Sequence, residues 1–179
     1  MITVVTKEPT FISTTGICST RKSFSYHKAD AIVSAANSFG IMDGGSDLAI
    51  VNMLGSAIAR RVKENVERFY NSELPVGSAF SLEINHPQYK WIIIAPTMRV
   101  PKNIANTDNV YQAMRAILRQ MKEHGIKDVV MPILGTGYGC MREEDAARQM
   151  MMAINTMNRP PRTYNEIHQT EEILNRTKR

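Results

Sequence analysis

The stretch Ala31-Ile-Val-Ser-Ala-Ala-Asn37 leads directly into Ser38-Phe-Gly-Ile-Met-Asp-Gly-Gly-Ser-Asp47, and these residues decide the fold. The first five are small or apolar, which is typical of a strand buried on both faces of a sheet. The glycine pair lets backbone approach a ligand closely, and a helix predicted to begin with Ser46 as N-cap, or at Asp47, offers free N–H groups that suit a phosphate. The alternative to a ligand-binding loop is that the glycine pair forms a tight turn, which Asn37 caps.

A second glycine-rich loop also lies between a predicted strand and a predicted helix. Residues 128–134 have the pattern of a strand, which runs into Gly135-Thr-Gly-Tyr-Gly139 before another helix. Three glycines in five residues can form a nest of N–H groups for an anion, and a plain glycine turn is the alternative. Neither loop matches a Walker A or a Gly-x-Gly-x-x-Gly pattern. Since ligands collect where the strands of an α/β sheet end, two such loops in one domain favour a phosphate-binding cleft.

Strand and helix patterns alternate along the 179 residues, a length that fits one domain. The expected strands are residues 2–5, 10–13, 31–35, 78–84, 91–95 and 128–134. The expected helices are one long helix from Ser46 or Asp47 to Tyr70, a second from Val110 until Gly125 stops it, a third over 146–157, and a short one over 164–175 within a basic tail, 158–179. This order predicts a mixed, largely parallel sheet covered on both sides. Residues 14–28 are left unassigned.

The composition narrows the classes of function. Hydrophobic residues make up 43% of the chain, and no apolar run could span a membrane, so we expect a cytoplasmic, monomeric globular protein. Cys18 and Cys140 form no disulfide framework or zinc ligand set, and the four histidines lack metal-ligand spacing, so no metal or cofactor is expected. The net charge of +5 would attract polyanions, but the basic residues are scattered and nucleic acid is the less favoured partner.

Together the two loops resemble those of the macro domain family. Asp30-Ala-Ile-Val-Ser-Ala-Ala-Asn37 is similar to its signature Asp-Ala-Ile-Val-Asn-Ala-Ala-Asn, and residues 135–139 resemble its second phosphate loop, Gly-x-Gly-aromatic-Gly. The Asn-x6-Gly-Gly spacing of residues 37–45 is that of the MacroD-type hydrolases. Ala95-Pro-Thr-Met-Arg-Val-Pro101 resembles a stretch in a bacterial and phage subgroup. The resemblance covers residues 28–157 and implies the three-layer α/β/α macro-domain fold.

The resemblance also implies a site for ADP-ribose or a derivative. Backbone amides of residues 44–46 would face one phosphate and the distal ribose, residues 135–139 would wrap the other side of the pyrophosphate, and Tyr138 would cover the ribose or the phosphates. Asn37 would orient the distal ribose, and Asp47, at the family's catalytic aspartate, would position or activate water. The predicted ligand-binding residues are Ala36, Asn37, Gly44, Gly45, Ser46, Leu134, Gly135, Thr136, Gly137, Tyr138 and Gly139.

Two simpler interpretations stay open. Asp47 would also fit as an ordinary acid in the first turn of a helix, where the dipole keeps it ionised and therefore a weak base. Cys140 follows the second loop, but no base pairs with it in the sequence, and it is interpreted as a bystander.

Three departures from the family pattern make binding a firmer expectation than hydrolysis. Many members carry Gly-Asp-Ile before the first strand, and its Asp binds adenine, whereas the best match here is Thr15-Gly-Ile17. Ser34 replaces the first Asn of the signature. Ser46 and Leu48 replace the Val and Gly that flank the catalytic Asp.

The expected activity is that of an ADP-ribosyl hydrolase or ADP-ribose 1″-phosphate phosphatase acting at the distal ribose. The candidate substrates are mono-ADP-ribose on a protein carboxylate, ADP-ribose 1″-phosphate and O-acetyl-ADP-ribose, so an ADP-ribosylated protein is a candidate partner. One alternative is a non-catalytic reader of ADP-ribose or poly-ADP-ribose. The other is an RNA or single-stranded nucleic-acid binder that uses the basic tail.

Overall fold

One sheet forms the centre of the molecule. The computed structural model describes residues 1–5, 17–20 and 23–178. Within them the strand order is β2-β1-β6-β3-β5-β4. Only the pair β4 and β5 is antiparallel, so the prediction of a mixed, largely parallel sheet is confirmed. The strands are β1 (Ile2–Val5), β2 (Ile17–Thr20), β3 (Ala31–Ser34), β4 (Phe80–Glu83), β5 (Trp91–Ile94) and β6 (Val129–Pro132).

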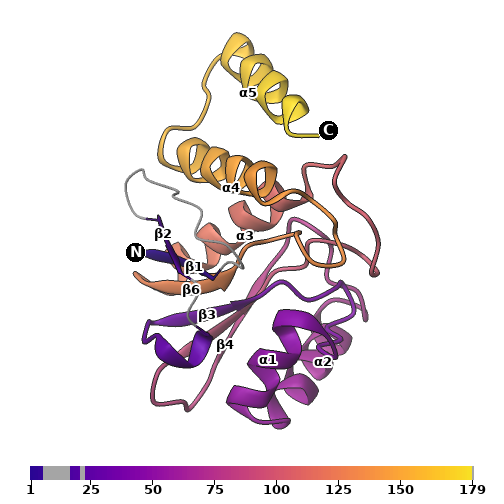
Figure 1. Ribbon diagram of the computed structural model, residues 1–179, viewed down its shortest axis with the longest axis vertical. Helices are drawn as coiled ribbons and strands as arrows, with labels where there is room; N and C mark the ends of the chain where they lie inside the picture. The colour runs from indigo at the N-terminus through magenta and orange to yellow at the C-terminus, as the bar shows by residue number, and fades with distance from the viewer. Residues whose placement is uncertain (6–16, 21–22, 179) are drawn as a thin grey trace.

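Helices cover both faces of this sheet (Figure 1). A short 3-10 helix, η1 (Phe24–Tyr26), precedes β3; α1 (Gly45–Leu54) and α2 (Ala57–Phe69) lie on one side, and α3 (Asn109–Glu123) and α4 (Glu143–Asn158) lie on the other. The final helix, α5 (Tyr164–Arg176), lies on the outer side of α4. The predicted three-layer α/β/α fold is therefore confirmed. Among the described helices, none combines the length and apolar character that a membrane crossing needs.

The alternation of side chains along the central strands builds a hydrophobic core on each face. In β5, Ile93 joins the core on the α3 and α4 side, whereas Ile92 and Ile94 join the core on the α1 and α2 side. Val33 and Ile32 divide in the same way along β3. Because successive residues of a strand point to opposite faces, a continuous apolar run is what a doubly covered strand requires.

The single long helix expected from Ser46 or Asp47 to Tyr70 is wrong. It is broken at Gly55, whose φ of 94° lies in a region that favours glycine and whose N–H donates to the Val51 carbonyl at 2.8 Å. The apolar spacing continues across the break, since both helices face the same core, and so periodicity alone could not show it. Ser46 as N-cap is also wrong, because Gly44 holds that position and no side chain caps α1.

The remaining differences are mostly at element boundaries. The strands expected at 31–35, 78–84, 91–95 and 128–134 are present but shorter, and β2 lies in the stretch left unassigned. The strand expected at 10–13 lies outside the described residues. The tail helix is confirmed: Thr163 and Glu166 form a capping box at its start, and Gln149 of α4 donates to Thr177 just after its end. The bond between Gln149 and Thr177 joins the end of the tail to α4.

Candidate functional site

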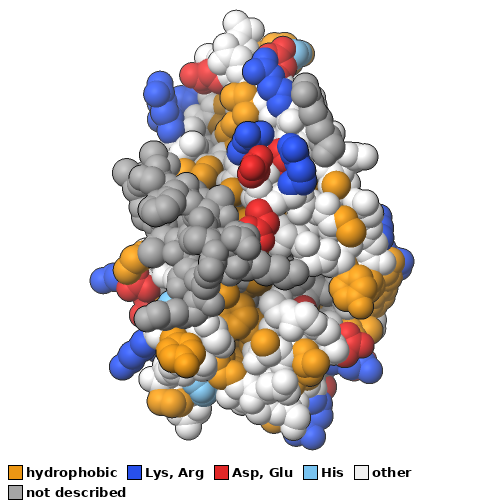
Figure 2. Space-filling view, viewed as in Figure 1, with side chains coloured by type: hydrophobic (Ala, Val, Ile, Leu, Met, Phe, Trp, Pro, Cys, Tyr) orange, Lys and Arg blue, Asp and Glu red, His pale blue; other side chains and the backbone are white. Residues whose placement is uncertain are grey.

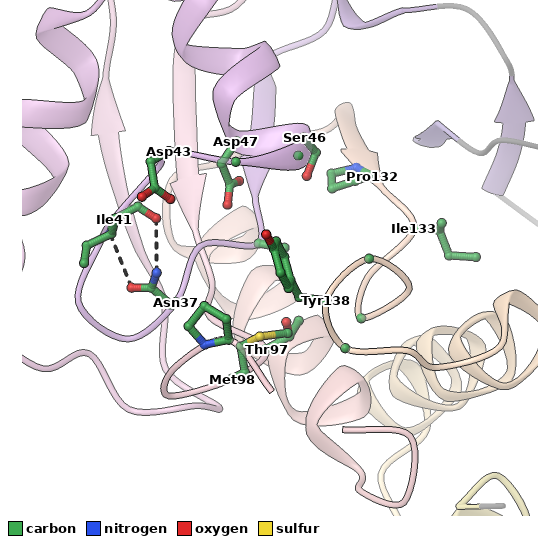
Figure 3. A pocket seen from close by; sticks show the side chains of 17 residues that line it. Asn37, Ile41, Asp43, Ser46, Asp47, Thr97, Met98, Pro132, Ile133 and Tyr138 are labelled. Carbon is green, nitrogen blue, oxygen red and sulfur yellow. Dashed lines mark hydrogen bonds between the residues drawn. The ribbon is translucent and has the colours of Figure 1, made fainter. Parts of the chain in front are cut away.

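A cleft opens where three neighbouring parallel strands end. β6, β3 and β5 are adjacent in the sheet, and the segments that follow them form its walls (Figure 3). The helices after β3 and β6 lie on opposite faces of the sheet, and such a change of side leaves a crevice at the carboxyl ends of the strands. The lining residues are Ala35, Asn37, Ile41, Asp43, Gly44, Gly45, Ser46, Asp47, Thr97, Met98, Pro101, Pro132, Ile133, Gly135, Gly137, Tyr138 and Gly139.

The first wall is the loop from Asn37 to Ser46, and the Asn37 side chain shapes it. The Asn37 Oδ1 accepts from the N–H groups of Phe39 and Ile41, at 3.0 and 3.3 Å, and its Nδ2 donates to the Ile41 carbonyl at 3.2 Å. Asn37 therefore does cap the turn of its own loop, as the alternative interpretation expected. An amide nitrogen carries two hydrogens, which leaves one for a partner in the cleft.

The start of α1 presents backbone donors to this cleft. Gly44, the N-cap, has extended backbone, and among the described residues no side chain bonds to the N–H groups of the first turn. Gly45 has a φ of 54°, and a Cβ placed on it would meet nothing within 4 Å. Uncapped N–H groups at a helix start attract anions, because the helix dipole is positive there.

Asp47 is in the first turn of α1, partly buried beside the cleft. Its Oδ1 accepts a hydrogen bond of 2.7 Å from the hydroxyl of Ser34, which is fully buried at the end of β3. Burial raises the pKa of Asp47 to about 6; the Ser34 hydrogen bond opposes this rise, and the negative charge of Asp43 adds to it. The expectation that Asp47 is a weak base is therefore wrong, because burial makes its carboxylate more basic, whereas the expectation that it is ionised at neutral pH agrees with a pKa of about 6.

The second wall is the loop from Gly135 to Gly139, and it is tightly packed from behind. A Cβ on Gly135 would lie 2.6 Å from Val110, and one on Gly139 would lie 2.8 Å from Ile104 Cγ1. The Gly139 carbonyl also accepts from the Ile104 N–H at 2.9 Å. By contrast, Gly137 has open space around it, and Tyr138 is 72% exposed over the cleft.

Comparison with known proteins identifies the family. The sequence model of the macro domain family matches residues 33–150, well over half of the chain. The chain belongs to the macro domain family. The matched range begins in β3, ends in α4 and contains both walls of the cleft.

Relatives of this macro domain occur in bacteria. A protein of Aquifex aeolicus is 38% identical over 126 residues, which span 70% of this chain and 73% of the relative. The macrodomain of Mycobacterium tuberculosis DarG is 20% identical with a TM-score of 0.65, covering 88% of this chain and 91% of its own. A mutant Oceanobacillus iheyensis macrodomain, solved with ADPR, is 17% identical with a TM-score of 0.68, covering 97% and 90%. At these identities the solved structures establish the fold.

The macro domain brings most of the predicted site residues to one cleft. Asn37, Asp47, residues 44–46 and the glycines and Tyr138 of the second loop all line it. Three predicted residues do not: Ala36 and Leu134 are buried in the core, and the Thr136 hydroxyl donates to the Ile133 carbonyl at 3.2 Å. Ala36 and Leu134 lie just beyond the ends of β3 and β6 with their side chains in the two hydrophobic cores, so only the backbone could reach a ligand.

A third wall was not predicted. Residues 97–101 follow β5, and Met98 forms a bridge with Asn37 that closes this side of the cleft. The sequence contained a signal for it, because 95–101 resemble a stretch of one macro-domain subgroup, but nothing along the chain placed that stretch beside Asn37. Asp43 was missed as well, although it lies inside the first loop.

The acidic and amide side chains, those of Asn37 and Asp43 among them, gather toward one end of the cleft, beside Ile41, and the apolar Pro132 and Ile133 lie toward the other end, beside Ser46 (Figure 3). Across the described residues no group of His, Cys, Asp or Glu could hold a metal ion, and Cys140 is exposed just beyond the second loop, outside the lining.

Proposed function

We propose that this macro domain binds ADP-ribose in the cleft between its two glycine-rich loops. One observation supports this most: the uncapped amides of the α1 start and the Gly135–Gly139 loop line the same cleft. A diphosphate needs donors from two sides, and backbone N–H groups supply them without the desolvation of a buried side-chain cation. The Oceanobacillus iheyensis macrodomain, which shares the fold, has been solved with ADPR and with ADP.

The positions of Asn37 at one end of the cleft and of Pro132 and Ile133 at the other set the direction of the ligand. The distal ribose lies at the Asn37 end, where the remaining amide hydrogen can donate to a sugar hydroxyl. The adenosine lies toward Pro132 and Ile133, where apolar surface suits a base. Tyr138 covers the middle of the ligand from the side of the second loop.

We further propose that the domain hydrolyses a bond at the distal ribose, with Asp47 as general base. A carboxylate with a pKa of about 6 is ionised at neutral pH and still basic enough to accept a proton. Water then attacks the carbon or phosphorus that carries the scissile oxygen. The water oxygen stays on that atom with one of its hydrogens, and the other proton passes to Asp47. Asp47 then gives this proton to the released oxygen, or to solvent where the released group is a carboxylate, and is ionised again. Asn37 and the loop amides hold the reacting end in place.

Calorimetric titration with ADP-ribose tests the binding proposal. We expect a saturable one-to-one heat that Gly44→Val reduces, and no heat from the native protein would refute the proposal. Incubation with carboxylate-linked mono-ADP-ribosylated protein then separates a hydrolase from a reader, because a reader binds and releases no ADP-ribose.

The nucleic-acid alternative has weaker support from the surface. Arg142 and Arg148 both pair with Asp145, and on the face shown in Figure 2 basic and acidic side chains are interspersed rather than joined into a basic surface. Binding of this kind would weaken steeply with salt and would be unaffected by Gly44→Val, and both are measurable with single-stranded RNA.

A further inference from the structure

The ribose end of the cleft is negatively charged. Asp43 and Asp47 both line it, and Figure 3 shows their carboxylates on the same side as Asn37. Asp43 is exposed, so its carboxylate can meet a ligand at this end. The two carboxylates are close enough to influence each other electrostatically.

In the described part of the chain, no positive side chain lines the cleft to balance these carboxylates. None of the seventeen lining residues, all from the described part of the chain, is Lys, Arg or His. The nearby cation Arg99 is engaged elsewhere: its guanidinium donates to Glu73 at 2.7 and 2.9 Å and stacks on the Phe39 ring. Among the residues that the structure describes, the positive contribution at the cleft comes from the α1 dipole, and the diphosphate uses it.

We infer that this site selects ADP-ribose derivatives whose distal ribose carries a neutral or positively charged substituent, and that Asp43 disfavours an anionic one such as a 1″-phosphate. The inference rests on the proposed function and narrows it. A group on C1″ continues the ligand beyond the ribose, toward Asp43 and Asp47. A phosphate there brings two negative charges to a place with two carboxylates and no cation, whereas an ester or a glycosidic link brings none.

The size of the effect follows from charge repulsion in a partly hydrated cleft. We expect ADP-ribose 1″-phosphate to bind about tenfold more weakly than ADP-ribose at low salt, because like charges a few ångströms apart repel across a moderate dielectric. The difference should shrink in about 1 M salt, where the screening length falls to about 3 Å.

Calorimetric titrations with these two ligands test the inference on the native protein, Asp43→Asn and Glu64→Gln. Asp43→Asn keeps the shape of the side chain and removes its charge. Glu64→Gln is the matched control, because Glu64 is an exposed acid on α2 outside the cleft, and its substitution changes the net charge by the same amount.

The expected result is a ligand preference that Asp43→Asn reduces by about fivefold and Glu64→Gln leaves unchanged. Equal affinity of the native protein for the two ligands, or tighter binding of the 1″-phosphate, would overturn the inference while the proposed function stands. An equal loss of preference in both variants would also overturn it, because net charge would then be the cause. Failure of ADP-ribose itself to bind the native protein would overturn both.

Discussion

The two glycine-rich loops look alike in the sequence but need their glycines for different reasons. In the second loop, Gly135 and Gly139 are glycines because Val110 and Ile104 leave no room for a Cβ. In the first loop, a Cβ on Gly44 would meet Tyr138 at an ordinary 3.9 Å and one on Gly45 would meet nothing within 4 Å, so packing does not require glycine at either position. The second loop is thus a wall defined by packing, whereas the first loop and the start of α1 hold the polar side chains Asn37, Asp43 and Asp47, for which we propose the chemistry. Substitutions should separate the two: stability responds at one wall and function at the other.

The largest expected effect is on stability, at the packed wall. Gly139→Ala would place a Cβ 2.8 Å from Ile104 Cγ1 and closer still to the Gly135 carbonyl oxygen, so the loop must shift. We expect the free energy of unfolding to fall by about 3 kcal/mol and Tm by about 10 °C. Gly137→Ala is the control within the same loop, because its Cβ would meet nothing. Equal stability of the two variants in thermal unfolding would refute the packing explanation.

The next largest expected effect is on turnover, from a substitution of Asp47. Asp47→Asn should slow hydrolysis at least about a hundredfold, because the general base is lost, and should leave ADP-ribose affinity within about threefold. Single-turnover release of ADP-ribose and calorimetry measure the two quantities. A parallel loss of binding would show that Asp47 is not purely catalytic.

The same variant has a pH-dependent effect on stability. The folded-state pKa of Asp47 lies above its usual value of 3.8, at about 6, so the folded protein binds a proton more tightly than the unfolded chain. Native stability therefore falls as pH rises from about 4 to about 6 and is level above that window with respect to this group. Asp47→Asn should be more stable than the native protein by about 1–2 kcal/mol at pH 7, with no gain below pH 4, in urea unfolding.

A smaller effect tests whether the first loop depends on open space. Gly44 has φ −147° and ψ 163°, an extended conformation that valine accepts, and a Cβ there would meet only Tyr138 at 3.9 Å. We expect Gly44→Val to weaken ADP-ribose binding about tenfold by filling the cleft, with a stability change under about 1 kcal/mol. Stability lost together with binding would mean that both loops are defined by packing.

The smallest expected effect concerns the hydrogen bond that Ser34 donates to Asp47. Ser34→Ala removes the hydroxyl that donates to Asp47 and so should raise the pKa of that carboxyl further, by less than about one unit. Carbon-13 NMR titration of the Asp47 carboxyl measures this shift directly, and the acidic limb of the rate profile should move to higher pH. Ser38→Ala is the matched control, because the Ser38 hydroxyl is also buried but has no hydrogen-bond partner among the described residues. A similar shift in both variants would rule out a specific effect of Ser34.

Much of the fold was predictable because it depends on local patterns. Apolar runs predicted β3, β5 and β6, and the Gly44-Gly45 pair and the glycines of residues 135–139 predicted where the walls of the cleft lie. The break at Gly55 was not predictable in the same way. Apolar residues continue at helical spacing across it, and a glycine within such a pattern is also compatible with an uninterrupted helix.

The site was predictable only in part, because its electrostatics depend on which residues meet in space. Asp43 and Asp47 lie four residues apart, and their shared effect on one end of the cleft appears only when β3, α1 and the loop between them are in place. Residues 97–101 show the same limitation: their pairing with Asn37 joins two loops 60 residues apart.

The sequence by itself determined the α/β alternation, the membership of two glycine loops in one cleft and the identity of Asp47 as a candidate base. The first two follow from periodicity and from residue types at fixed spacing along the chain, and the third follows from the resemblance to the macro domain family. Only the tertiary structure decided that burial raises the pKa of Asp47 and that Asn37 uses most of its amide to hold its own loop. It also decided that two carboxylates lie at the Asn37 end of a cleft whose lining, among the described residues, contains no Lys, Arg or His. Burial and charge balance are properties of the whole set of neighbours around an atom, and folding brings those neighbours together from distant parts of the chain.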